Sequence, residues 1–169
     1  LHLMDADGKE VPLAEENCRQ AGTAAGGTEQ TVSFRVPVAQ PRKWSAEDPY
    51  LYTLVLEEHS GSGTVYESAQ VGFRKITYKT TSSGWFEGST DCFRGVDRHE
   101  THPEYGYAIP KEVMEEDIRI MLENNINAVR TSHYPNSPYW YYLCDKYGIY
   151  VVDEANVECH SNMIYENER

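Results

Sequence analysis

Apolar and polar residues alternate along the first half of the chain, which is the pattern of half-buried β-strands. The alternation is clear over residues 31–38, 51–57 and 65–73, and it continues over residues 75–78. Residues 60–63 (SGSG) separate two of these segments and predict a hairpin loop. Short strands at this spacing favour an antiparallel β-sandwich.

The second half of the chain changes to helical periodicity. Residues 110–125 predict a helix with Pro110 at its first position. Residues 137–147 predict a second helix that ends at Gly148, and residues 126–130 and 149–154 are short apolar strands. Strand, helix and strand with short connections predict a parallel βαβ unit, as in a barrel or a doubly wound sheet. The apolar stripe of the first helix is Val113, Met114, Ile118, Met121 and Leu122.

Polar residues follow the carboxyl ends of the predicted parallel strands. Arg130 ends one strand and His133 lies in the loop after it, while Glu154 ends the next strand. An earlier segment, residues 93–96, leads into His99. In barrels of βα units, chemistry gathers at this end of the strands. We therefore expect one rim to carry His99, Arg130, His133, Glu154, Glu158 and His160.

Two pairs of residues have either a chemical or a purely local role. Glu158 and His160 are two residues apart, so on an extended loop both side chains point to the same side. A carboxylate with an imidazole can supply part of the shell of a divalent ion, and the alternative is a solvated pair of loop residues. His99 and His102 are likewise either functional or ordinary loop histidines.

Composition narrows the choice of partners and compartment. Of the 169 residues, 40% are hydrophobic, and the net charge of −12 disfavours nucleic acid and anionic membranes but permits a neutral substrate such as a sugar. No apolar run reaches the roughly 18 residues of a membrane span. The first residues resemble neither a signal peptide nor the start of a whole protein. The four cysteines form no CxxC pair, and we expect reduced thiols in a cytoplasmic protein.

Several segments match the motifs of one known family. Residues 95–103 (GVDRHETHP) are similar to GVNRHEHHP, and residues 127–136 (NAVRTSHYPN) match the signature NAVRxSHYPN. Residues 143–148 (LCDKYG) and 152–156 (VDEAN) follow at the family's spacing. With similar segments upstream, the chain resembles glycoside hydrolase family 2, of the large β-galactosidase type, over roughly residues 35–160.

The resemblance implies both a fold and a function. The fold is the C-terminal part of an immunoglobulin-like β-sandwich at residues 1–79, followed by the first βα units of a (β/α)8 TIM barrel at residues 80–169. The function is that of a retaining β-galactosidase, acting on small neutral β-galactosides and homo-oligomeric in its full-length form. His99 and His133 match histidines that bind the sugar and stabilise the transition state. Arg130 matches an arginine that orients the nucleophile, and Glu158 and His160 match ligands of Mg²⁺.

The chain also departs from the family. Asp97 replaces the usual asparagine and adds a carboxylate near His99. The motifs that hold the acid/base and nucleophile glutamates are absent, and we expect Glu154 to be structural instead of replacing either. We therefore expect an inactive internal fragment of a longer enzyme. Two alternatives stay open: a non-catalytic remnant or complementing module, if the chain is complete as given, or another family 2 specificity such as β-glucuronidase.

Overall fold

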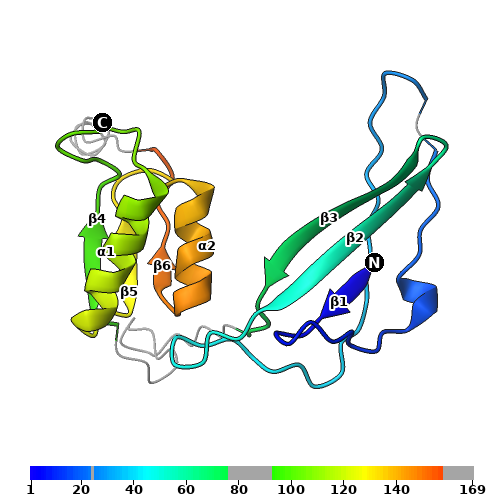
Figure 1. Ribbon diagram of the computed structural model, residues 1–169, viewed down its shortest axis with the longest axis horizontal. Helices are drawn as coiled ribbons and strands as arrows, with labels where there is room; N and C mark the ends of the chain where they lie inside the picture. Colours follow the sequence, from blue (N-terminus) through cyan, green and yellow to red (C-terminus); the bar gives the residue numbers. More distant parts are fainter. Residues whose placement is uncertain (24, 76–92, 158–169) are drawn as a thin grey trace, which may run out of the picture. The chain divides into compact units, whose positions relative to one another are not determined.

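The computed structural model describes residues 1–23, 25–75 and 93–157, and the chain divides into two compact units (Figure 1). The N-terminal unit comprises Leu1–Ser45 and Tyr50–Arg74. The C-terminal unit comprises Ala46–Pro49 together with Lys75–Arg169. Each unit contains its own three-stranded sheet.

The N-terminal unit contains an antiparallel sheet of order β1-β2-β3. Its strands are β1 at His2–Met4, β2 at Tyr52–Ser60 and β3 at Gly63–Val71. Figure 1 shows β2 and β3 as one long hairpin, with β1 beside the start of β2. The predicted hairpin loop is confirmed, because Ser60 pairs with Gly63 across two intervening residues. Gly63 has a φ of +134°, a conformation that favours glycine.

The prediction of a strand at residues 31–38 is wrong. The alternation is present in the burial, since Phe34, Val36 and Val38 are half-buried between exposed neighbours. The segment nevertheless joins no strand ladder, because alternation alone does not supply a partner for its N–H and C=O groups. The strands predicted at residues 51–57 and 65–73 are confirmed as β2 and β3, and residues 76–78 lie outside the described residues.

Aromatic side chains pack together in the N-terminal unit. Trp44 and Tyr52 are buried, and the Tyr52 ring meets those of Tyr50 and Phe73 edge to face at 5.0 and 5.2 Å. A short 3-10 helix, η1 at Glu15–Asn17, buries none of its residues. Within the described residues this unit contains one sheet, so the two-sheet sandwich stays a prediction.

The C-terminal unit contains a parallel sheet of order β4-β5-β6. Its strands are β4 at Gly95–Arg98, β5 at Ala128–Thr131 and β6 at Tyr150–Val152. Helix α1 (Lys111–Glu123) connects β4 with β5, and helix α2 (Pro138–Tyr147) connects β5 with β6. Figure 1 shows both helices on the same side of the sheet. The predicted parallel βαβ arrangement is confirmed.

One apolar core joins these helices to the sheet. Ile118 of α1, Trp140 and Leu143 of α2 and Val129 of β5 are each at most 1% exposed and belong to one cluster. Truncating such a side chain to alanine costs about 2–5 kcal/mol. Leu122, which the sequence placed in the apolar stripe, is 43% exposed. Successive side chains on a helix are turned by about 100°, so Leu122 points away from the buried face on which Met121 lies.

Side chains of Asn124 and Ser137 hydrogen-bond to the backbone at helix ends. Asn124 caps α1, and its side-chain N–H donates to the carbonyl of Ile120 at 2.9 Å. Ser137 caps the start of α2, where its Oγ accepts from the N–H of Tyr139 at 3.3 Å. Pro110 differs from the prediction by one position, because it is the N-cap of α1 and not its first helical residue.

Gly148 ends α2 in the left-handed conformation, with a φ of +76°. A Cβ at this position would lie 2.3 Å from the carbonyl oxygen of Ala46. The segment Ala46–Pro49 therefore packs at the carboxyl end of α2, although the chain on both sides of it belongs to the N-terminal unit. The turn and the close approach both require glycine.

Candidate active-site rim

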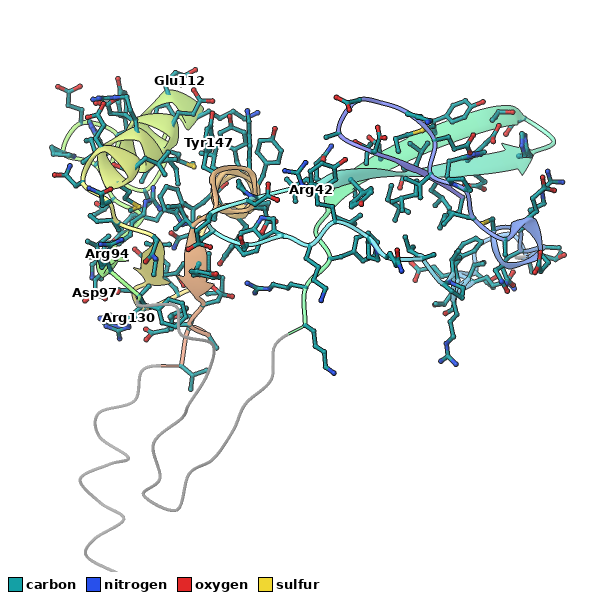
Figure 2. The ribbon with its side chains drawn as sticks, turned by 90° about the horizontal axis from the view of Figure 1, so that it is seen from below. Arg42, Arg94, Asp97, Glu112, Arg130 and Tyr147 are labelled. Carbon is teal, nitrogen blue, oxygen red and sulfur yellow. The ribbon has the colours of Figure 1, made fainter. Side chains whose placement is uncertain are left out.

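The carboxyl ends of β4, β5 and β6 lie at one edge of the parallel sheet, and charged side chains gather there. Asp97 of β4 is the register partner of Arg130 of β5, and Figure 2 shows the two side chains next to each other. Arg130 Nη1 lies 3.5 Å from Asp97 Oδ1. Glu154 follows β6 and accepts a hydrogen bond from Arg130 Nε. Three successive strands thus bring one cation and two carboxylates together.

Two histidines lie at the same edge. His99 follows β4 and His133 follows β5, and their ring centroids are 5.4 Å apart with an interplanar angle of 75°. The ring of Tyr134 lies 6.1 Å from that of His99. His99 is exposed and the side chain of His133 is 35% exposed, so a ligand at the rim can reach both rings.

Glu154 connects the arginine with the second histidine. Its Oε1 accepts from Arg130 Nε, and its Oε2 lies 3.1 Å from Nδ1 of His133. Nη2 of Arg130 also lies 3.1 Å from that Nδ1. A ring nitrogen either carries a proton or lacks one, so Nδ1 donates to Glu154 or accepts from Arg130. In both cases Nδ1 is engaged, and Nε2 is the ring nitrogen left for a ligand.

Opposite charges at the rim stabilise the ionised forms of its residues. Hydrogen bonding from Arg130 lowers the pKa of the Glu154 carboxyl below its ordinary value. The same contact with Glu154 raises the pKa of Arg130, and attraction from Asp97 acts in the same direction. Arg130 is therefore a permanent cation whose charge is matched by two neighbouring carboxylates.

A further carboxylate after β6 holds the strand end. Asp153 Oδ1 accepts from Thr131 Oγ1 at 2.9 Å and from the hydroxyl of Tyr141 at 2.6 Å. The backbone N–H of Glu154 donates to Thr131 Oγ1 at 3.0 Å. Burial, and then the contact with Asp153, raises the pKa of Tyr141. These bonds tie β5, α2 and Glu154 together, so they support the position of the Glu154 carboxylate.

The structure brings together four of the six residues predicted for the rim: His99, Arg130, His133 and Glu154. Glu158 and His160 lie outside the described residues, and their role as metal ligands stays a prediction. Within the described ranges, no group of three or more His, Cys, Asp or Glu residues could hold a metal ion. His102 stacks on Tyr105 at 4.8 Å, an ordinary contact for a loop histidine.

Sequence reasoning missed how the rim is supported. Asp97, which adds a carboxylate near His99, contacts Arg130. Arg98 and Asn136 are buried and hydrogen-bonded to each other, and Glu100 binds the start of α2. The sequence could have pointed to these residues only by their position. Each of them stands within three residues of a predicted site histidine.

The described part of the chain contains two of the four cysteines. Cys18 and Cys144 are free thiols, and burial raises the pKa of Cys144 to about 12, which removes it as a nucleophile. Cys92 and Cys159 lie outside the described residues. In the part of the chain that the structure describes, no helix has the length and apolar character of a membrane span.

Known families match both units of the chain. Residues 82–168 match the family described as glycosyl hydrolases family 2, TIM barrel domain, and residues 5–74 match the family described as glycosyl hydrolases family 2. The chain belongs to glycosyl hydrolase family 2. The parallel β/α unit is therefore part of the family 2 barrel domain, and the resemblance seen in the sequence is confirmed.

Proteins named as a β-galactosidase and as β-glucuronidases resemble this chain over most of its length. A β-galactosidase of Psychromonas ingrahamii is 46% identical over 154 residues, which cover 89% of this chain and 14% of that protein. A β-glucuronidase from Ruminococcus gnavus in complex with D-glucuronic acid is 25% identical, with a TM-score of 0.69, over 91% of this chain and 24% of that one. Apo β-glucuronidase 3 of Bacteroides uniformis is 26% identical, with a TM-score of 0.69, over 91% and 18%. The chain thus spans a small part of the proteins that it matches.

Proposed function

We propose that the chain is part of a longer, retaining β-galactosidase that removes terminal non-reducing β-D-galactose residues from β-galactosides. The observation that carries this proposal is the 46% identity with the Psychromonas ingrahamii β-galactosidase over 89% of the chain. The proposal includes an immunoglobulin-like sandwich before the barrel, a homo-oligomeric full-length enzyme and a cytoplasmic location.

The proposed chemistry assigns the two histidines to the sugar. Retaining hydrolysis uses an acid/base and a nucleophile carboxyl group about 5 Å apart, with a transition state that resembles an oxocarbenium ion. Neither carboxyl role is assigned to a residue of this chain. His99 and His133 hydrogen-bond the sugar and bind the transition state more tightly than the ground state, which raises the rate itself. His133 uses Nε2 for this contact, because its Nδ1 faces Glu154 and Arg130.

Arg130 orients the nucleophile carboxylate, which another part of the longer protein supplies. Its Nε donates to Glu154 and its Nη1 lies near Asp97, so the guanidinium plane is already held on two sides. A guanidinium fixed in this way presents its remaining N–H groups in a set geometry to a further carboxylate. Its positive charge also favours the ionised, nucleophilic form of that carboxylate.

Glu158 and His160 supply part of a Mg²⁺ site in this proposal. A carboxylate oxygen suits a hard ion that takes about six ligands and keeps several waters, while imidazole is a less usual partner. The two residues therefore need further oxygen ligands. When bound, the ion adds positive charge that tunes the neighbouring acid/base glutamate. The support is the donor chemistry of the pair and its match to the family motif.

A β-glucuronidase is the second candidate, because the solved structures described above are β-glucuronidases. A glucuronide carries a carboxylate, and its recognition needs a cation that is not already engaged elsewhere. Arg130 of the rim is held by Glu154 and Asp97 and is assigned here to the nucleophile carboxylate, and the net charge of the chain is −12. Together with the higher identity to a β-galactosidase, this favours a neutral galactoside.

The test is turnover of nitrophenyl β-galactoside and β-glucuronide by the complete enzyme. We expect kcat/KM to be higher for the galactoside; a preference for the glucuronide would replace the proposal, and hydrolysis of neither would overturn both. The intact mass of the native protein complements this test. A mass no larger than that of these 169 residues would favour the remnant or complementing module.

A further inference from the structure

The loops that carry His99 and His133 are tied together behind the rim. One loop follows β4, and the other follows β5 and leads into α2. The backbone N–H of Ser132 donates to the carbonyl of Arg98 at 3.0 Å. The side chain of Arg98 donates through Nη1 to Asn136 Oδ1 at 2.7 Å. These bonds connect the beginnings of the two loops.

Glu100, the residue after His99, makes two further bonds between the loops. Its Oε1 accepts from the backbone N–H of Ser137 at 2.9 Å, and its own N–H donates to the hydroxyl of Tyr134 at 3.1 Å. The Glu100 side chain is 17% exposed, so water competes little for these partners. Ser137 is the N-cap of α2, where unpaired N–H groups favour a carboxylate.

Arg98, the residue before His99, is anchored as well. Its side chain is 6% exposed, its guanidinium lies 3.9 Å from the ring centroid of Trp140, and its Nε donates to Asp117 at 3.0 Å. Its Nη1 lies 3.7 Å from Glu100 Oε1. A buried guanidinium with these partners is costly to displace, because displacement would leave charges unpaired. Both chain neighbours of His99 are therefore fixed.

We infer that Glu100 is a positioning residue that holds His99 beside His133 by clamping the loop after β4 to the start of α2. The inference rests on the proposed function, since the spacing of the histidines affects turnover only if both meet the sugar. Without the clamp both histidines remain, but the loop that carries His99 can shift. A displacement of about 1 Å near the reacting atoms can reduce a rate by about 100-fold.

The test compares Glu100→Ala with Glu100→Gln in the complete enzyme. Glutamine keeps an oxygen that can accept from Ser137, and alanine does not. We expect Glu100→Ala to lower kcat by about 10- to 100-fold with KM changed by less than about threefold. Glu100→Gln should keep at least about a third of the wild-type kcat, because a neutral acceptor preserves the bond. Glu104→Ala removes an exposed glutamate of the same loop and should leave kcat unchanged.

A second comparison separates positioning from simple capping of α2. If Glu100 acts through His99, then Glu100→Ala should cost less than about threefold in a His99→Ala background. The same 10- to 100-fold loss in both backgrounds would overturn the inference, as would a lower melting temperature with kcat and KM unchanged. Tyr134→Phe removes the acceptor of the Glu100 N–H and should give a smaller loss in kcat than Glu100→Ala.

Crystal structures of the complete wild-type enzyme and its variants give a readout that does not depend on turnover. The ring separation of His99 and His133 is 5.4 Å here. It should grow by about 1 Å or more in Glu100→Ala and stay the same in Glu100→Gln. An unchanged separation in Glu100→Ala would overturn the clamp. If the wild type hydrolyses no glycoside, the proposed function fails on that result, and the clamp is judged by the ring separation.

Discussion

Glu154 Oε2 lies 3.1 Å from Nδ1 of His133. The other oxygen of the same carboxylate accepts from Arg130, so one side chain orients both the cation and a histidine of the rim. The backbone of Glu154 is held in turn by Thr131. The direction in which His133 presents Nε2 is therefore built into the folded chain and does not depend on a bound sugar.

Replacing His133 with alanine should lower kcat more than it raises KM. A donor that fits the transition state better than the ground state is worth about 100-fold in kcat. Steady-state kinetics of the complete enzyme on nitrophenyl β-galactoside measure both constants. His102→Ala is the control, because His102 stacks on Tyr105 and should be dispensable. A change confined to KM would mean that His133 contributes ground-state binding only.

Replacing Glu154 with glutamine should change how stability depends on pH. Arg130 lowers the pKa of Glu154 below its ordinary value of 4.5. The ionised carboxylate therefore stabilises the folded state above pH 4.5, and this contribution is lost as the pH falls through the lower, folded-state pKa. At neutral pH the midpoint temperature of thermal inactivation should be higher for the wild type than for the variant. This difference should shrink in acid. A difference that grows on acidification would contradict the ion pair.

Replacing Glu158 with glutamine should weaken the dependence of activity on Mg²⁺. The substitution keeps the size of the side chain but removes the charge that attracts a hard cation. Titrating Mg²⁺ into the metal-free complete enzyme should show activation at a higher concentration and with lower turnover. Glu123→Gln, which removes an exposed carboxylate of α1, is the control. Magnesium activation identical to the wild type would remove Glu158 from the metal site.

Replacing Gly148 with alanine should lower the stability of the C-terminal unit by more than Gly8→Ala lowers the stability of the N-terminal unit. Both glycines have nearly the same φ, +76° and +77°, so both variants pay about 1–2 kcal/mol for the left-handed conformation. Only at position 148 would the new Cβ meet a backbone atom, the carbonyl oxygen of Ala46 at 2.3 Å. That overlap should add about 1–3 kcal/mol. Thermal inactivation of the two variants measures the difference. Equal losses of stability would show that the backbone near Ala46 moves to accommodate the new Cβ at little cost.

The sequence predicted most of the fold because its elements are local. The hairpin of β2 and β3, both helices and the parallel strands follow from periodicity and from residues such as Gly148. Residues 31–38 have the same alternation as β2, and they form no strand because pairing depends on a partner elsewhere. Leu122 is exposed because the helix is buried on a narrower face than its apolar content suggests.

The candidate site was predictable only as far as strand ends and motifs reach. His99, Arg130, His133 and Glu154 could be placed at one edge because parallel strands align their carboxyl ends. The contacts among these residues could not be predicted, since the bond between Glu154 and His133 depends on side-chain conformations in loops. The role of Glu100 was hidden for the same reason, because its partner Ser137 stands 37 residues away in the sequence.

The borders of the two units do not follow the order of the chain. In the sequence, Ala46–Pro49 lies between the two segments of the N-terminal unit. In the structure it belongs to the C-terminal unit, where Ala46 contacts the end of α2. Recombination that exchanged the first unit for that of a relative would therefore also exchange part of the packing of the barrel. A chimaera should keep that packing only if the incoming segment places a backbone carbonyl beside Gly148 as Ala46 does. We therefore expect the two parts of the protein to be inherited together and not as freely exchangeable modules.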